Sequence, residues 1–190
     1  GDLDHVWVDL GAVGKTLKSL KQEGCEDVVM AGPIDRPSLS TVKPDMRALK
    51  LMPKLLKARG DNGLLSVLVE EFESEGFVVV GIDDVMENVL ADIGAMGRVQ
   101  PDETQQADIH RGIDVVKGLG ALDVGQAAIV QQGFVLGVEA AEGTDGLITR
   151  CANMQRPGSA AVLVKMAKPH QDRRADLPTI GLRTIEAAVQ

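Results

Sequence analysis

The sequence has few aromatic residues and no excess of positive charge. Tyr is absent, and one Trp and three Phe make up 2% of the 190 residues. Lys and Arg number 20 against 28 Asp and Glu, which gives a formal net charge of −8. An acidic chain repels phosphate backbones, and four aromatic rings offer few platforms for base stacking. We therefore expect no nucleic acid among the partners.

Long apolar runs and cysteine pairs are also missing. No run approaches the roughly 18 apolar residues of a membrane helix, and the first residues lack the basic and apolar regions of a signal peptide. Cys25 and Cys151 stand far apart, without a Cys or His at metal-ligand spacing. These absences favour a cytoplasmic protein with reduced thiols, and 44% hydrophobic residues are enough for a real core.

The first half of the chain alternates between strand-like and helix-like segments. Runs of apolar and β-branched residues predict strands at residues 5–10, 27–31 and 77–81, and apolar residues at helical spacing predict helices at 13–22, 46–57 and 63–75. The run at 77–81 is uninterrupted by polar residues, as is typical of buried parallel strands. The pattern predicts a parallel α/β layer.

The second half has a different pattern. Residues 93–102 contain Gly94, Gly97 and Pro101 without a clear period, and we interpret them as a linker. Beyond them we predict a helix at 103–119, a hairpin of strands 127–130 and 134–138, a helix at 143–150, a strand at 161–166 and a helix at 183–189. This half is predicted to be a mixed α+β domain.

Residues 9–16 are similar to the phosphate-binding loop GxxxxGK[ST], in which backbone N–H groups and a lysine surround phosphate at a helix start. The first glycine of that pattern is replaced by Asp9. A carboxylate there repels phosphate oxygens, and its β-carbon obstructs the close approach of backbone. We therefore predict a glycine turn before an ordinary helix, with Lys15 in solvent.

Residues 165–179 gather four cations and two carboxylates in an otherwise acidic chain. Arg can hold phosphate oxygens bidentately, and carboxylates can bind a Mg2+ ion that neutralises a pyrophosphate. Glu139, Glu142 and Asp145, which follow a predicted strand, are further candidate ligands for Mg2+. Each group of residues also has an alternative interpretation. Residues 165–179 can be a surface loop stabilised by ion pairs, and the acids at 139–145 can be a solvated turn with a helix-capping acid.

Several short motifs recur in an order that is characteristic of one family. In the first half they are Gly14-Lys15, Ala31-Gly32 with Arg36-Pro37, Gly60-Asp61 before Leu64-Leu65, and Glu75-Gly76-Phe77. In the second half they are Gly125-Gln126, Val138-Glu139-Ala140, Glu142-Gly143-Thr144-Asp145, and the run from Lys168 through Arg174 and Asp176 to Gly181. This succession covers nearly the whole chain and resembles the LpxI family, the UDP-2,3-diacylglucosamine pyrophosphatases of lipid A synthesis in Gram-negative bacteria.

The resemblance implies a fold and a reaction. It implies a Rossmann-like N-terminal domain (1–92, lacking its first strand), the linker (93–102) and a C-terminal catalytic and substrate domain (103–190, incomplete at its end). It also implies Mg2+-dependent hydrolysis to UMP and 2,3-diacylglucosamine 1-phosphate (lipid X), with water directed at the phosphorus on the sugar side. The lipid is expected between the domains. We expect peripheral contact with the inner face of the inner membrane through the substrate, and a homodimer is one expected assembly.

The family's motifs also imply roles for individual residues. Asp176 is the expected catalytic carboxylate, either as a metal ligand or as a base, and Asp172, Glu139 and Asp145 are further expected metal ligands. The expected substrate-binding residues are Lys168, Arg174, Gln171, Gln126, Thr144 and Thr179. Asn62-Gly63 departs from the family pattern, which puts a role for the Gly60-Asp61 loop in doubt. A noncatalytic nucleotide-sugar or lipid-phosphate binding module, and a different nucleotide-diphosphate hydrolase, are the alternatives.

Overall fold

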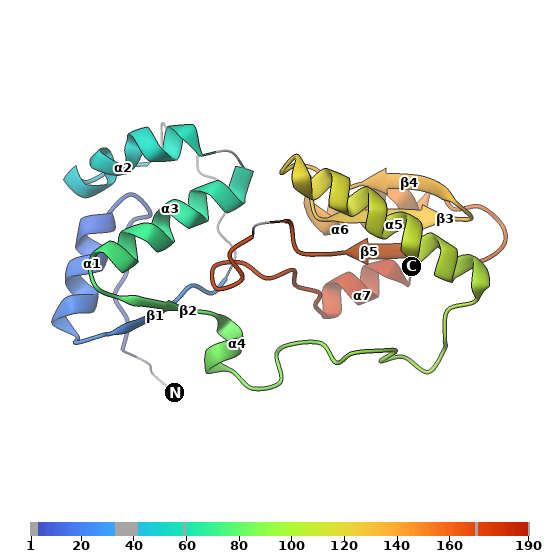
Figure 1. Cartoon of the computed structure of the whole chain (residues 1–190), viewed down its shortest axis with the longest axis horizontal. Coiled ribbons are helices and arrows are strands. Elements are labelled where there is room, and N and C mark those ends of the chain that lie inside the picture. The colour runs from blue at the N-terminus through green and yellow to red at the C-terminus, as the bar shows by residue number, and fades with distance from the viewer. Residues whose placement is uncertain (1–3, 33–41, 59, 170, 190) are drawn as a thin grey trace. The chain divides into compact units, whose positions relative to one another are not determined.

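A computed structural model describes residues 4–32, 42–58, 60–169 and 171–189, without the side chains of Gly60 and Asp61 (Figure 1). The chain forms two compact units. The first comprises Gly1–Leu90 together with Asp172–Asp176, and the second comprises Ala91–Gln171 together with Leu177–Gln190. Each unit has its own sheet and helices.

The first unit contains the parallel α/β layer that the sequence predicts. Its elements are α1 (Val13–Gln22), β1 (Asp27–Val29), α2 (Met46–Lys57), α3 (Gly60–Ser74), β2 (Val78–Val80) and α4 (Ile82–Val85). Strands β1 and β2 are parallel, with Asp27 opposite Val78 and Val29 opposite Val80. Leu17 of α1, Val28 of β1 and Phe77 before β2 form a buried apolar cluster between the helices and the sheet.

The helices of this unit are confirmed, but one predicted strand is wrong. Residues 5–10 form no strand and pair with neither β1 nor β2. Their apolar side chains lie in solvent, with Trp7 87% and Val6 59% exposed. An alternating apolar pattern makes a strand only when a neighbouring strand completes its hydrogen bonds. The short α4 was not predicted, since four residues are too few to show a helical period.

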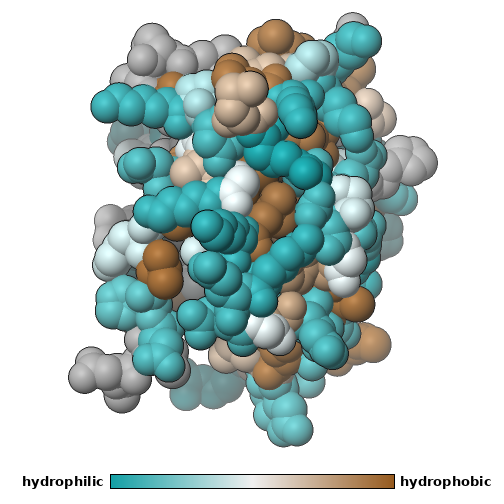
Figure 2. All heavy atoms as spheres, turned by 90° about the vertical axis from the view of Figure 1, so that its left-hand side faces the viewer, coloured by the Kyte–Doolittle hydropathy of each residue, from teal (hydrophilic) through white to brown (hydrophobic). Residues whose placement is uncertain are grey.

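One face of the first unit is mostly polar. Figure 2 views the side of this unit on which α1, α2 and α3 lie, and hydrophilic side chains predominate on that face. Ion pairs join α1 and α2 to Glu75, which directly follows α3: Lys21 Nζ lies 2.5 Å from Glu75 Oε2, and Arg47 Nη2 lies 2.5 Å from Glu75 Oε1. The hydrogen bonds from Lys21 and Arg47 lower the pKa of the Glu75 carboxyl.

The second unit is the mixed α+β half. Its elements are α5 (Glu103–Ala121), β3 (Ala127–Gln131), β4 (Phe134–Val138), α6 (Gly143–Ala152), β5 (Val162–Lys165) and α7 (Leu182–Ala188). The sheet has the order β4-β3-β5 with antiparallel neighbours, and every residue of the central β3 is buried. Val116 of α5 packs with Ala128 on one face, while Leu147 of α6 packs with Ile129 on the other. The predicted hairpin is confirmed.

A buried carboxylate fixes the turn of this hairpin. Asp108 of α5 is fully buried and accepts the backbone N–H groups of Gln132 at 2.7 Å and Gly133 at 2.6 Å. Both turn residues have positive φ, 52° and 79°, as tight hairpin turns require. The turn therefore depends on a helix residue more than 20 positions away in the sequence as well as on local chemistry.

Candidate active site

The segment Asp172–Asp176, which carries the expected catalytic residue, belongs to the first unit although the sequence assigned it to the C-terminal domain. It forms a tight turn around Asp172. The carbonyl oxygen of Asp172 accepts the N–H groups of Ala175 at 3.0 Å and Asp176 at 3.1 Å, and its Oδ1 accepts the N–H of Arg174 at 3.0 Å. Asp176 lies half-buried at the end of this turn.

Arg174 holds the turn against α3 and β2. Its Nε and Nη2 donate to Oδ1 and Oδ2 of Asp172 at 3.0 and 2.8 Å, a bidentate arrangement. Its Nη1 donates to Oε1 of Glu73 at 2.7 Å and to the carbonyl of Val79 at 3.4 Å. The N–H of Asp172 donates to Oδ1 of Asn62 at 3.4 Å. These contacts explain why five residues from late in the chain cluster with the first unit.

This turn lies at the carboxyl end of the parallel sheet. Gly81 directly follows β2, and a β-carbon at position 81 would lie 3.6 Å from the Cα of Arg174. Because β1 and β2 run parallel, their carboxyl ends share this edge. Open parallel α/β sheets bind ligands outside the carboxyl ends of their strands. Asp176 is therefore on a segment placed where such a fold holds its substrate.

Asp172, Arg174 and Glu73 form a cluster of ion pairs at the turn. The hydrogen bond from the Arg174 side chain holds the pKa of the Asp172 carboxyl below its ordinary value. Hydrogen bonds to Asp172 and Glu73 raise the pKa of Arg174. Both carboxylate oxygens of Asp172 accept donors from Arg174. This geometry suits a carboxylate that shapes the turn better than the metal ligand expected from the sequence.

The N-terminus of α1, which resembles a phosphate loop, already holds an anion from the chain itself. Oδ2 of Asp45 accepts the N–H groups of Gly14 at 2.7 Å and Lys15 at 3.3 Å. Its Oδ1 accepts those of Arg47 at 3.0 Å and Ala48 at 2.9 Å, which caps α2. Burial raises the pKa of this carboxyl, but the four backbone donors together lower it. The helix is an ordinary one with an exposed Lys15, as predicted.

Three of the expected site residues come together in the second unit. Glu139 is 6% exposed; its Oε2 accepts the N–H of Gln126 at 2.8 Å and its Oε1 accepts the hydroxyl of Thr144 at 2.6 Å. Gly125 allows this approach, because a β-carbon there would lie 2.1 Å from the Glu139 carbonyl oxygen. In the described part of the chain, Oε1 of Gln126 is buried without a hydrogen-bond partner. Glu139 thus joins the start of β3 to the start of α6.

The four acids expected to hold a metal are divided between the units. Asp172 and Asp176 belong to the first unit, and Glu139 and the exposed Asp145 belong to the second. Among the described residues, no group of three or more His, Cys, Asp or Glu side chains is arranged to hold a metal ion. Mg2+ commonly takes one or two protein carboxylates and completes its shell with water and substrate phosphates. Such a site does not require three acids from one unit.

The remaining expected residues are held within the second unit. Nζ of Lys168 lies 2.6 Å from Oδ1 of Asp123, and the lysine side chain is only 11% exposed. The N–H of Lys168 donates to Oε1 of Gln171 at 2.8 Å. Nζ of Lys165 donates to the carbonyl of Thr179 at 2.8 Å. The ion pairs of Lys168 and Arg174 match the alternative of a loop stabilised by ion pairs, and sequence reasoning did not identify their partners Asp123 and Glu73.

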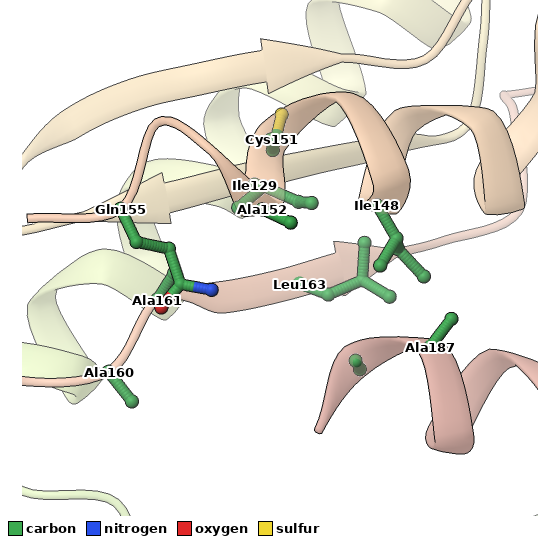
Figure 3. Close-up of a pocket in the computed structure, with 10 residues that line it drawn as sticks. Ile129, Ile148, Cys151, Ala152, Gln155, Ala160, Ala161, Leu163 and Ala187 are labelled. Atoms are coloured by element: carbon green, nitrogen blue, oxygen red, sulfur yellow. The ribbon is translucent and has the colours of Figure 1, made fainter. Parts of the chain in front are cut away.

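A cavity of about 110 Å³ lies elsewhere in the second unit. Figure 3 shows Ile129 and Leu163 from the sheet, Ile148 and Cys151 from α6, and Ala187 from α7 around it. Burial raises the pKa of the Cys151 thiol. None of the expected site residues lines this cavity. Among the described residues, no helix combines the length and apolar character that a membrane span requires.

Comparison with known proteins matches both halves of the chain. Residues 2–89 match the LpxI N-terminal domain, and residues 92–190 match the LpxI C-terminal domain. The chain is 43% identical over 191 aligned positions to a protein of Caulobacter vibrioides (strain ATCC 19089 / CIP 103742 / CB 15) named UDP-2,3-diacylglucosamine pyrophosphatase LpxI. The alignment covers 96% of this chain and 68% of that protein.

Proposed function

Because the chain belongs to the LpxI family, we propose that it hydrolyses the pyrophosphate bond of UDP-2,3-diacylglucosamine in lipid A synthesis. The products are UMP and 2,3-diacylglucosamine 1-phosphate. The observation that carries this proposal is the 43% identity, over nearly the whole chain, to a relative named for that activity. The place of Asp176, on a turn at the carboxyl edge of the parallel sheet, supports it.

The reaction adds water across a phosphoric anhydride. The water oxygen forms a bond to the phosphorus on the sugar side, the bridging P–O bond breaks, and its electron pair leaves with UMP. A proton of the water must pass to a base. We propose Asp176 as the carboxylate that acts on this water, either by accepting the proton or by holding a metal ion beside it.

We also propose that Mg2+ takes part and that Asp176 is its ligand in the first unit. The ion, when bound, neutralises charge on the diphosphate and polarises the phosphorus. A single protein carboxylate is compatible with Mg2+ because the substrate's own phosphates supply further oxygens. Asp172 does not offer an open carboxylate, since Arg174 occupies both of its oxygens.

The two cations expected to bind the diphosphate already have carboxylate partners. Lys168 pairs with Asp123, and Arg174 pairs with Asp172 and Glu73. Direct binding of phosphate by either cation therefore requires an exchange of partners, in which an oxygen of the dianionic diphosphate displaces a carboxylate. Lys168 is the more buried of the two, with 11% of its side chain exposed against 41% for Arg174.

The proposed lipid substrate also implies contact with a membrane. We propose that it contacts the inner face of the membrane peripherally, because the acyl chains of the substrate are anchored there. Sedimentation with vesicles that contain UDP-2,3-diacylglucosamine, compared with vesicles that lack it, tests this contact. Light scattering in solution tests the expected homodimer.

Release of UMP tests the proposed activity. The protein should release UMP from UDP-2,3-diacylglucosamine in the presence of Mg2+, and chelation of the metal should stop the release. UDP-N-acetylglucosamine, which has the same diphosphate without the two long acyl chains, should be a much poorer substrate. Equal turnover of both would favour a general nucleotide-diphosphate hydrolase, and binding without any UMP release would favour a noncatalytic module.

A further inference from the structure

We infer that Glu73, on α3, is a positioning residue for Asp176, acting through Arg174 and Asp172. This inference rests on the proposed function, since it concerns the carboxylate that acts in that reaction. Glu73 lies 101 positions before Arg174 in the sequence, and their side chains meet at 2.7 Å. Glu73 belongs to none of the motifs by which the chain resembles its family.

The argument begins with the path of the chain. Gln171 and Leu177 belong to the second unit, so the five residues between them leave that unit and return to it. The segment belongs to no helix or strand, and backbone hydrogen bonds from Ala175 and Asp176 to Asp172 form its turn. A short turn without regular structure needs side-chain contacts to hold one position on the unit against which it packs.

Arg174 supplies those contacts on the segment side. Its bidentate pair with Asp172 closes the turn, and its Nη1 reaches outward to Glu73 and, more weakly, to the carbonyl of Val79. Glu73 is thus the charged group of α3 that connects the closed turn to a regular element of the first unit. The backbone N–H of Asp176 is bonded within the same turn, at 3.1 Å from the Asp172 carbonyl oxygen.

The charges of this cluster also argue against a free phosphate-binding role for Arg174. One guanidinium faces two carboxylates, so the cluster carries a net charge of about −1 at neutral pH. A diphosphate approaching it meets more negative than positive charge. The ion pairs of Arg174 with Asp172 and Glu73, which we call the clamp, fix the turn. Asp176 lies two residues after Arg174, so the clamp also fixes the position of Asp176.

The test compares E73Q with E70Q. Both substitutions remove one carboxylate from α3, but Glu70 pairs with Lys54 at 3.0 Å on an exposed surface, with both side chains about 60% exposed. Hydrogen exchange of the Ala175 and Asp176 amides reports the turn directly. We expect E73Q to lower their protection about two- to fivefold, as suits a partly exposed ion pair, and E70Q to leave it unchanged.

Kinetics supply the second measurement. We expect E73Q to lower kcat for UMP release about two- to tenfold with little change in KM, because a displaced carboxylate impairs the chemical step more than binding. R174K, which keeps the charge but loses the bidentate fork, should lower both protection and kcat further. Wild-type protection and wild-type kcat in E73Q would overturn the inference. A rise in KM alone would overturn it as well, because that result indicates direct substrate binding.

The two measurements separate this inference from the proposed function. Hydrogen exchange needs no substrate, so unchanged protection in E73Q refutes the positioning role whatever the activity. If the wild-type protein releases no UMP while E73Q still lowers protection, the proposed function fails and the clamp of the turn remains.

Discussion

Replacement of Asp45 should destabilise the first unit more than the loss of an ordinary helix cap. The carboxylate of Asp45 accepts four backbone N–H groups, two at the start of α1 and two at the start of α2. The cap of α2 is worth about 1 kcal/mol, and hydrogen bonds to a charged acceptor at α1 add about 1.5–3 kcal/mol. We therefore expect D45A to lower the free energy of unfolding by about 2.5–4 kcal/mol, or Tm by roughly 5–16 °C for a chain of this size.

The variant D45N separates the two contributions. An asparagine oxygen can still cap α2, but its NH2 group then faces the N–H donors of Gly14 and Lys15. We expect D45N to cost about 1–2 kcal/mol, less than D45A but more than nothing. Urea unfolding followed by far-UV circular dichroism measures both variants.

A matched control lies in the other unit. Asp102 caps one helix, α5, through a 2.7 Å bond from the N–H of Gln105, and its Oδ2 accepts the exposed hydroxyl of Ser159 at 3.0 Å. D102A should therefore cost about 1 kcal/mol. If D45A costs no more than D102A, or if D45N is as stable as the wild-type protein, the carboxylate does not stabilise α1 and the reasoning is wrong.

Two further predictions concern the site residues. The hydrogen bond from Arg174 lowers the pKa of Asp172 in the folded protein, so this pair contributes its full stability above the unfolded pKa of about 3.9 and loses it as the pH falls through the lower folded value. Hydrogen-exchange protection of the Asp176 amide should therefore fall below about pH 4 in the wild type. A protection factor that does not change with pH in this range would contradict the pairing. G125A should destabilise the second unit by about 3 kcal/mol or more in a thermal melt, because its β-carbon would lie 2.1 Å from the Glu139 carbonyl oxygen, whereas wild-type stability would show that this approach is not tight.

The sequence could predict those parts of the fold that depend on local chemistry. Helices α1 and α2 have the predicted bounds, because the apolar spacing lies within each helix. Asp45, which caps α2, directly precedes that helix in the sequence. The hairpin of β3 and β4 follows from two apolar runs around a glycine turn. Residues 5–10 were wrongly predicted, because a strand depends on a neighbour that the pattern of one segment cannot reveal.

The candidate site could be predicted only in part, for a related reason. The motif residues Gln126, Glu139 and Thr144 do meet in one hydrogen-bond network. The partners of the cationic loop, in contrast, come from distant parts of the chain. Helix α3 carries three glutamates, and helical periodicity does not indicate that Glu73 is the one beside Arg174.

The same long-range pairing changes how the cationic loop is understood. A count of charges within residues 165–179 shows more cations than acids, which suggests groups available to phosphate. Asp123 and Glu73 lie outside that window, and they pair with Lys168 and Arg174. Charge balance in a loop is therefore set by the folded surroundings, which a linear window leaves out.

The central claim is that Asp176 acts in the hydrolysis of a UDP-linked lipid diphosphate, and D176N tests it most directly. The measurement is the single-turnover rate of UMP release from UDP-2,3-diacylglucosamine with Mg2+, for the wild type and for D176N, with substrate binding measured in parallel. We predict that the wild type releases UMP, and that D176N binds the lipid but is slower by about a hundredfold or more. A D176N variant that releases UMP at the wild-type rate would contradict the account.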